Sequence, residues 1–303
     1  MIYPHRNITL RQLRAFCAVY EEGSFTRAAE EIHLTQSAVS KLCAELEATL
    51  GMTLFERSTR RIKALLAADD LYAHATRVLR SMQELEQGMQ AGQSQVRGVL
   101  RVSAAPMIVY GLLMPAIQSF SQQFPAVHIH LVECATDETL DAIRRHRVDV
   151  GIVSNAQLGA DLLSELIYED VMCLVCPAGH PLVALEKISW DDVVQYDHVA
   201  LQNHYGVRRV IDQIGLDSGH LWQPHVEAGM LSTVFGLVGA GLGIAIIPHY
   251  ASEIARQLGL AVLDLNQLML EQHSIYLLRS RQSTLSAAAE AFREELITGL
   301  RQL

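Results

Sequence analysis

The sequence predicts an α plus α/β protein: an N-terminal winged helix-turn-helix, a linker helix, and a C-terminal α/β domain made of two subdomains. Three observations predict this order. Two short amphipathic helices and a basic hairpin come first, a heptad stripe of apolar residues follows, and strands then alternate with helices. The expected domains are residues 1–66, 67–92 and 93–303, with subdomain I at 93–168 and 269–303 and subdomain II at 169–268.

Residues 23–47 predict two short helices joined by a tight turn. Ser24 is a good N-cap for the first helix, and Thr35 opens the second. The apolar positions of the second helix are Val39, Leu42 and Leu46. Its outward positions hold short or polar side chains, at Gln36, Ser37, Ser40, Lys41 and Ala44. Such side chains enter a DNA major groove without blocking it, whereas periodicity alone equally allows a helix pair with a solvated polar face.

A basic hairpin follows these helices and favours the DNA-binding interpretation. It spans residues 54–63 and carries four cations, at Arg57, Arg60, Arg61 and Lys63. A cationic hairpin beside a recognition helix is suited to phosphates or to the minor groove. The predicted DNA-binding residues are Ser24, Thr26, Thr35, Gln36, Ser37, Ser40, Lys41, Arg57, Arg60 and Arg61. Among them, the amide of Gln36 can pair bidentately with adenine.

Several further motifs occur in a fixed order along the chain. They are LRQLRAF at 10–16, GSFTRAA at 23–29, TQSAVS at 35–40, LE at 46–47, LG at 50–51, LFER at 54–57, and the segments 98–102, 124–127, 149–152, 179–182 and 239–248. This pattern resembles the LysR-type transcriptional regulators. The resemblance implies a dimer or tetramer that binds double-stranded DNA at an inverted repeat. It also implies a small-molecule effector in the C-terminal cleft and a C-terminal fold similar to periplasmic binding proteins.

A heptad stripe predicts one long linker helix over residues 69–90. Its apolar positions are spaced by four and three: Leu71, Ala75, Val78, Met82, Leu85 and Met89. At a rise of about 1.5 Å per residue the helix would be about 33 Å long. The resemblance implies that it is the dimerisation element, although a stripe this short also fits a helix packed on its own domain. Asp69 replaces the glycine usual in the family, so we expect Asp69 to cap the helix.

From Gly98 onward, strands alternate with helices. The expected strands are residues 99–103, 127–133, 148–153, 171–177, 198–201, 243–248 and 273–278, and the expected helices include 108–124, 138–146 and 283–302. The first three strands predict an α/β unit with a parallel sheet, and a second unit of the same kind follows. The last strand and the last helix are expected to return to the first unit.

Two sheets joined by crossing strands leave a cleft in which α/β proteins bind small molecules. Strand ends and helix starts predict its effector-binding residues, Ser103, Ala105, Met107, Thr136, Ser154, Asn203 and His204. In many family members the first of these loops carries a hydroxyl that holds an effector carboxylate, but Ala105-Pro106-Met107 stands there in this chain. The sequence therefore predicts a more apolar pocket. Helix capping explains Thr136 and Asn203 equally well.

The net charge of −9 argues, on its face, against a nucleic-acid partner. Residues 1–66, however, hold nine basic against seven acidic residues, whereas residues 91–303 hold thirteen against twenty-two. Phosphate binding depends on the local patch, so the acidic C-terminal part does not exclude DNA. The one long uncharged stretch, residues 228–252, is interrupted by glycines and predicts no membrane helix. Five cysteines without an even framework and no signal segment predict a cytoplasmic protein.

The remaining motifs predict no catalytic residue, no metal site and no cofactor. Gly239, Gly241 and Gly243 lie after a helix and before a strand, the reverse of the dinucleotide-binding order, so we expect a tight turn. Cys173 and Cys176 lie on one predicted strand and point to opposite faces, beyond disulfide reach. They are expected to be buried thiols.

Three other function classes stay open. A ligand-binding protein with a vestigial head would show no sequence-selective DNA affinity. A redox switch would act through Cys134, Cys173 or Cys176. An enzyme in the cleft is the least favoured, because no Gly-x-Ser-x-Gly, P-loop or His-Glu-x-x-His motif occurs. His128 and His130 share one strand face, but two imidazoles alone are a weak metal signal.

Overall fold

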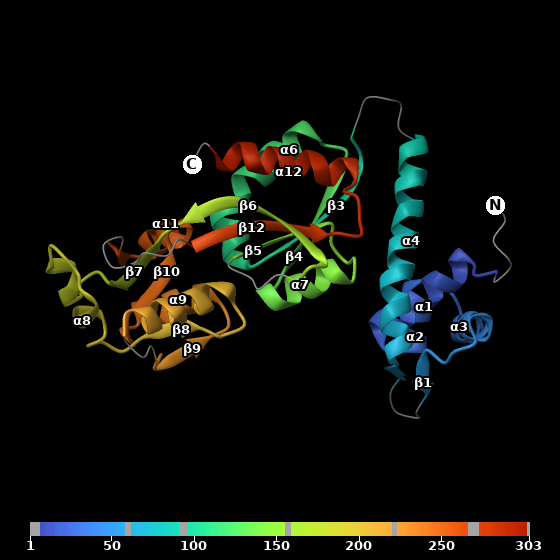
Figure 1. The fold of residues 1–303 in the computed structure, drawn as a ribbon, viewed down its shortest axis with the longest axis horizontal. Coiled ribbons are helices and arrows are strands. Elements are labelled where there is room, and N and C mark those ends of the chain that lie inside the picture. Colours follow the sequence, from blue (N-terminus) through green and yellow to red (C-terminus); the bar gives the residue numbers. More distant parts are fainter. Residues whose placement is uncertain are drawn as a thin grey trace. The chain divides into compact units, whose positions relative to one another are not determined.

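The computed structural model describes residues 7–57, 62–90, 96–154, 159–219, 223–265 and 273–301 (Figure 1). Contacts divide the chain into two compact units. The first, the head unit, consists chiefly of residues up to Ser94, and the second, the effector unit, begins at Gln95.

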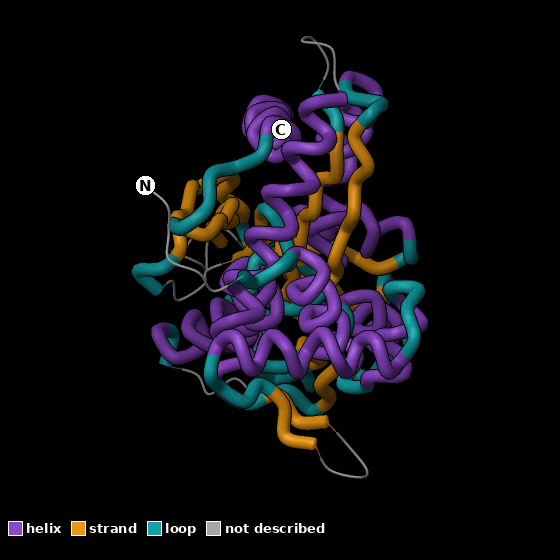
Figure 2. Tube along the Cα trace, turned by 90° about the vertical axis from the view of Figure 1, so that its right-hand side faces the viewer, coloured by secondary structure: helices purple, strands orange, loops and turns teal. Residues whose placement is uncertain are grey.

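The head unit is a winged helix-turn-helix. Its elements are α1 (Leu10–Glu22), α2 (Phe25–Glu31), α3 (Gln36–Leu50), the antiparallel strands β1 (Phe55–Arg57) and β2 (Ile62–Ala64), and α4 (Leu66–Gln90). Figure 2 shows β1 and β2 extending beyond the helices of the head. Thr9 and Gln12 form a capping box at α1, and Ser24 caps α2. Both helices predicted within residues 23–47 are therefore confirmed.

One core holds these elements together. Phe16 from α1, Ala28 from α2 and Val39 from α3 are fully buried. The small Ala28 allows the helices to cross closely. The carboxylate of Glu47 accepts hydrogen bonds from the backbone N–H groups of Leu54, at 2.8 Å, and of Phe55. The hairpin is thus tied directly to α3.

Helix α4 begins at Leu66, three residues before the predicted start. The expectation that Asp69 caps it is wrong, because the carbonyl of Leu65 already accepts the first hydrogen bond and Asp69 lies inside the first turn. The carboxylate of Asp69 instead accepts a hydrogen bond from the Tyr20 hydroxyl. The rings of Tyr20 and Tyr72 stack with centroids 4.2 Å apart, which fastens α4 to α1.

The heptad stripe on α4 has two different environments. Ala75 is buried and Leu71 partly buried in the head core, so the first part of the stripe packs on its own unit. Val78 is 44% exposed. The side chains of Leu85 and Met89 lie outside the described residues. Among the described stripe residues, Val78 is the one exposed for the dimer contact that the resemblance implies.

Subdomain I is built on a five-stranded sheet in the order β4-β3-β5-β12-β6. The strands are β3 (Gly98–Ala104), β4 (Val127–Glu133), β5 (Val150–Ser154), β6 (Leu162–Asp170) and β12 (His273–Ser280). Strand β3 runs parallel to β4 and β5, whereas β12 runs antiparallel to β5 and β6. The parallel arrangement predicted for the first three strands and the expected return of the last strand are both confirmed, and β6 and β12 make the complete sheet mixed. The reason is that β12 enters from the direction in which β6 leaves.

Helices cover both faces of this sheet. They are α5 (Pro106–Ile108), which continues through a π-helical turn (Val109–Leu113) into α6 (Met114–Gln123), together with α7 (Thr136–Arg144) and α12 (Ala287–Leu300). Figure 1 shows α6 and α12 on one face and α7 on the other. The rings of Phe120 and Phe292 meet edge-on at 5.4 Å between centroids, in the core under α6 and α12.

Subdomain II has a three-stranded sheet in the order β10-β7-β11 and a separate parallel pair, β8 with β9. The strands are β7 (Met172–Pro177), β8 (Val199–Leu201), β9 (Val226–Ala228), β10 (Ala245–Pro248) and β11 (Leu260–Asp264), and the helices are α8 (Trp190–Val193), α9 (Gly206–Asp217), α10 (Leu231–Gly239) and α11 (Ser252–Gln257). Both neighbours of β7 are antiparallel to it. The prediction of a second parallel sheet is therefore wrong. The chain enters both β10 and β11 at the end of the sheet where β7 finishes, so both run in the direction opposite to β7.

The predicted turn between α10 and β10 is confirmed, with Gly241 in a left-handed conformation (φ 79°). Cys173 and Cys176 are buried on β7, and burial raises the pKa of their thiols to about 12 and about 11. Within the described parts of the chain, every helix is too short or too polar to cross a membrane.

Candidate functional sites

The first turns of α3 form an exposed polar surface. Gln36, Ser37 and Lys41 are exposed and Ser40 is half-buried, while Val39 behind them is fully buried. No side chain of this group is long and apolar. The helix therefore presents hydrogen-bonding groups to solvent from a rigidly packed base.

Two of the predicted DNA-binding residues are N-caps. Thr35 Oγ1 accepts a hydrogen bond from the Ala38 N–H at 3.2 Å, and Ser24 Oγ accepts one from the Arg27 N–H. Each cap satisfies an amide that the first turn of its helix leaves free. Thr26, in the first turn of α2, is exposed.

The hairpin provides the basic part of this surface. Arg57 ends β1, and Lys63 on β2 is exposed opposite Glu56. The side chain of Arg57 and the whole of Arg60 and Arg61 lie outside the described residues. The Leu54 and Phe55 amides bonded to Glu47 place β1 next to α3.

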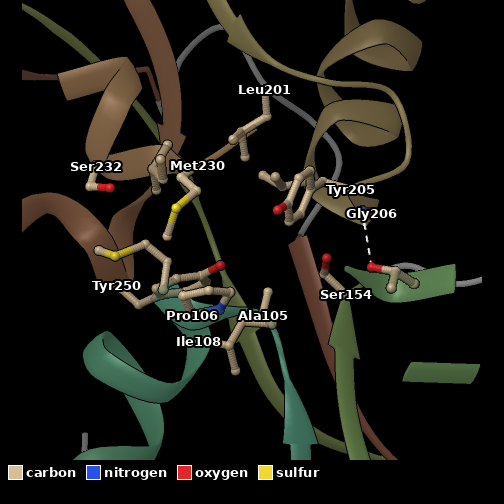
Figure 3. A pocket seen from close by; sticks show the side chains of 14 residues that line it. Ala105, Pro106, Ile108, Ser154, Leu201, Tyr205, Gly206, Met230, Ser232 and Tyr250 are labelled. Carbon is tan, nitrogen blue, oxygen red and sulfur yellow. Dashed lines mark hydrogen bonds between the residues drawn. The ribbon is translucent and has the colours of Figure 1, made fainter. Parts of the chain in front are cut away.

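A pocket lies between subdomains I and II of the effector unit (Figure 3). Its lining consists of Ala105, Pro106, Met107, Ile108, Thr136, Ser154, Leu201, Tyr205, Gly206, Val207, Met230, Leu231, Ser232 and Tyr250. None of these side chains is charged, and most of them are apolar. The hydroxyl groups of Thr136, Ser154, Ser232 and the two tyrosines provide the side-chain polarity.

Four helices begin at this pocket. Pro106 starts α5, Thr136 starts α7, Gly206 starts α9 and Leu231 starts α10, and all four residues are part of the lining. The first amides of a helix have no partner within the helix and carry partial positive charge. The pocket thus combines apolar walls with a weakly positive set of backbone donors.

Gly206 brings the two subdomains together. Its N–H donates a hydrogen bond to Thr136 Oγ1 at 3.1 Å, as the dashed line in Figure 3 shows. A Cβ at this position would lie 2.2 Å from the carbonyl oxygen of Ser154. Only glycine permits such a close approach of α9 to the end of β5.

The structure brings four of the predicted effector residues to the pocket: Ala105, Met107, Thr136 and Ser154. Ser103 does not line it. Its side chain is fully buried on the other face of the sheet, where its hydroxyl pairs with Thr139 Oγ1 at 2.9 Å. Asn203 is exposed, and His204 packs its ring on Tyr205, so neither lines the pocket. The loop turns away after β8 before α9 begins.

The loop after β8, from which the sequence predicts cleft residues, does reach the pocket, through Tyr205, whereas sequence reasoning did not find Met230, Tyr250 or the other lining residues of subdomain II. Tyr205 and Met230 immediately precede α9 and α10. Tyr250 follows β10 within two residues. The signal was available for Tyr250, because a residue just after a buried strand ending in proline lies at the edge of its sheet.

A buried polar group lies behind Tyr250. The Tyr250 N–H donates to Asp170 Oδ2 at 3.1 Å, and burial raises the pKa of Asp170. His273 pairs opposite Asp170 across β12 and β6, and its ring stacks on Tyr250 at 6.1 Å. His273 is fully buried, and neither ring nitrogen has a hydrogen-bond partner among the described residues. Burial lowers its pKa to about 4.

The described residues contain no cluster of three His, Cys, Asp or Glu side chains that could hold a metal ion. His128 and His130 are both exposed on β4. Cys134 is half-buried and lies 3.2 Å from Ser103 Oγ.

Comparison with known proteins identifies both units. Residues 10–66 match the model of the bacterial regulatory helix-turn-helix protein, lysR family, and residues 93–301 match the LysR substrate binding domain. A probable RuBisCO transcriptional regulator of Cyanidioschyzon merolae is 31% identical over 259 residues, covering 83% of this chain and 84% of that protein.

Solved structures share the fold. A full-length OxyR variant from Pseudomonas aeruginosa is similar at a TM-score of 0.76 and 23% identity, covering 98% of this chain and 96% of that one. Full-length CbnR in complex with its target DNA is similar at a TM-score of 0.68 and 19% identity, covering 95% and 98%. The matched regions and the identity to the curated relative decide the assignment: this chain belongs to the LysR family of transcriptional regulators, with a DNA-binding helix-turn-helix and an effector-binding domain.

Proposed function

We propose that α3 reads base edges in the major groove and that the hairpin contacts the sugar-phosphate backbone. The groove residues are Gln36, Ser37, Ser40 and Lys41, and the phosphate residues are Ser24, Thr26, Arg57, Arg60 and Arg61. Thr35 holds the first turn of α3 by capping it. The observation that carries this proposal is the exposed polar first turn of α3 on a fully buried base.

The active form, in this proposal, is a cytoplasmic dimer, or a tetramer of two dimers, on an inverted repeat. Two heads related by a twofold axis read the two half-sites. Its functional domains are residues 1–66 for DNA binding, 67–92 for dimerisation and 93–303 for effector binding. Val78, which is exposed on α4, supports a second copy as its partner.

The effector, in the same proposal, is a small molecule with a largely apolar body. Ala105, Met107, Thr136 and Ser154 contact it, together with the pocket residues of subdomain II. The absence of charged side chains from the lining supports this class, because a ligand with several charges would be buried there without a counter-ion.

The test is selection of bound fragments from random duplex DNA by the purified protein. We expect an interrupted inverted repeat to be recovered. Gln36→Ala should then weaken binding to that repeat by about 1–3 kcal/mol and relax the preference at one position, since an amide to adenine contact is lost. The measurement is the dissociation constant for the selected repeat and for its single-base variants.

Thr49→Ala is the matched control on the same helix. Its hydroxyl bonds to the Glu45 carbonyl near the end of α3, far from the first turn, so the base preference should not change. Recovery of no preferred sequence, with weak and wholly salt-dependent binding, would leave the effector unit as the working part and contradict the assignment of α3.

A further inference from the structure

We infer that Asp137 and Arg209 form an ionic latch that fastens the two subdomains at the mouth of the effector pocket. Arg209 Nη2 lies 2.7 Å from Asp137 Oδ1 and 2.8 Å from Asp137 Oδ2. Asp137 belongs to α7 of subdomain I, and Arg209 belongs to α9 of subdomain II. The role rests on the proposed effector pocket, but the contact itself does not depend on the identity of the effector.

The latch is adjacent in the chain to two residues of the pocket. Asp137 follows Thr136, and Arg209 lies one helical turn after Gly206. Thr136 and Gly206 are themselves joined by the hydrogen bond across the two subdomains. The ion pair and this hydrogen bond therefore break together when α9 separates from α7, and the pocket opens on that side.

The neighbouring arginine shows that α9 has two differently used sides. Arg208 is buried and bonds to the Leu201 carbonyl at 2.8 Å, to Glu227 at 2.6 Å and to Asp212 at 2.7 Å. All three partners belong to subdomain II, so Arg208 anchors α9 there. Arg209 reaches across to subdomain I instead. Helix α9 is thus anchored in subdomain II through Arg208, while Arg209 can form or break its ion pair with Asp137.

The latch is weak enough to be reversible. The side chains of Arg209 and Asp137 are 37% and 57% exposed, so salt screens their attraction. An exposed ion pair changes an equilibrium by a small factor, on the order of twofold to fivefold. That factor matters at a hinge, because the apparent affinity of a ligand scales with the population of the binding-competent state. Asp137 and Arg209 are positioning residues for the pocket rather than ligand contacts.

The Gly206 amide provides a direct measure of the closed state. Its N–H is bonded only when α9 meets Thr136, so its hydrogen exchange reports how often the subdomains separate. The experiment measures exchange in overlapping peptides across residues 204–210 of the full chain, in wild type, Asp137→Asn, Arg209→Gln and the double variant, at low and high salt.

We expect each single variant to speed exchange of this amide roughly twofold to fivefold, and the double variant to be no faster than either single one. High salt should speed exchange in wild type and leave the double variant unchanged. Additive effects of the two substitutions, unchanged rates, or a wild-type amide without protection would each overturn the latch.

Arg144→Gln is the matched control. Arg144 pairs with Asp161 at 2.8 Å with similar exposure, 40% and 45%, but both residues belong to subdomain I. Faster hydrogen exchange of the Gly206 amide in Arg144→Gln would show that loss of any surface ion pair has this effect, and it would overturn the inference. Selection of DNA is independent of this readout, so a failed latch with intact sequence-specific binding is distinguishable from a failed regulator.

Discussion

The recognition surface and the effector pocket are assembled in opposite ways. The groove residues lie within two turns of one helix, so a single amphipathic segment places them all. The pocket collects its residues from segments between Ala105 and Tyr250, and four separate helix starts meet there. The first site therefore depends on local periodicity and a well-packed base. The second depends on topology, and any change in how the subdomains meet alters it.

The largest expected effect comes from truncating one buried ring in each unit. Each substitution should destabilise its own unit and leave the other unit unchanged. Phe292 is fully buried against Phe120 in the effector unit. Phe292→Ala should lower the unfolding free energy of that unit by about 3–5 kcal/mol. Both tryptophans of the sequence, Trp190 and Trp222, belong to the effector unit, so urea unfolding followed by their fluorescence measures this loss.

Phe16→Ala is the counterpart in the head, where the ring is fully buried against Phe55. It should speed hydrogen exchange of the α1 amides and leave the tryptophan transition in place. If either substitution shifted both readouts equally, the two cores would not be independent and the comparison would fail.

A smaller effect is expected from a change of pH, which should alter the stability of the effector unit. His273 stays neutral in the fold with a pKa of about 4, below its ordinary value of about 6.5, so the unfolded chain binds a proton first on acidification. Stability is thus present above about pH 6.5 and is lost as the pH falls towards 4. For one such histidine the loss reaches about 2 kcal/mol at pH 5. Tryptophan-monitored unfolding between pH 7.5 and 5 measures it.

His273→Leu should remove about half of this slope, because burial also lowers the pKa of His198 to about 4. Asp170 works in the other direction, since burial raises its pKa and the folded state keeps its proton more tightly. His128→Leu, at an exposed position on β4, is the matched histidine-to-leucine control. An unaltered slope in His273→Leu would exclude His273 as its source.

The smallest effect sharpens the assignment within α3. Thr35→Ala removes the cap and should cost about 1 kcal/mol of head stability, with faster exchange of the Ala38 amide. Thr35→Ser keeps an oxygen in place and should restore both stability and DNA affinity. If Thr35→Ser restored stability but not affinity, the threonine methyl group would itself contact DNA.

The contrast also explains what sequence could predict. The helix-turn-helix emerged from caps at Ser24 and Thr35 and from apolar spacing, all of them local signals. The sequence does not mark the start of α4, because Leu65, whose carbonyl accepts the first hydrogen bond of the helix, has no side chain that could cap it. The environment of Ala75 and Val78 could not be separated by spacing, since a heptad stripe does not say which partner it meets.

In the effector unit, strand positions were predictable but strand directions were not. Runs of buried residues mark β5 and β7, whereas the antiparallel neighbours of β7 follow from the path of the chain between subdomains. Ala105 and Thr136 can be predicted as pocket residues because each comes shortly after the end of a strand. Ser103 is close in sequence to the pocket residues, yet it lies within β3 rather than after it, and its hydroxyl faces Thr139 of α7.

The position of β12 inside its sheet has a consequence for synthesis on the ribosome. The strand lies between β5 and β6, both of which are translated before the whole of subdomain II. Until β12 emerges, β5 lacks its neighbour on one edge, β6 lacks the strand it pairs with, and the α6 surface lacks α12. The head, by contrast, has its complete core once α4 has emerged. A nascent chain therefore carries a folded head and an incomplete subdomain I sheet. During that interval the effector unit is most exposed to misassociation.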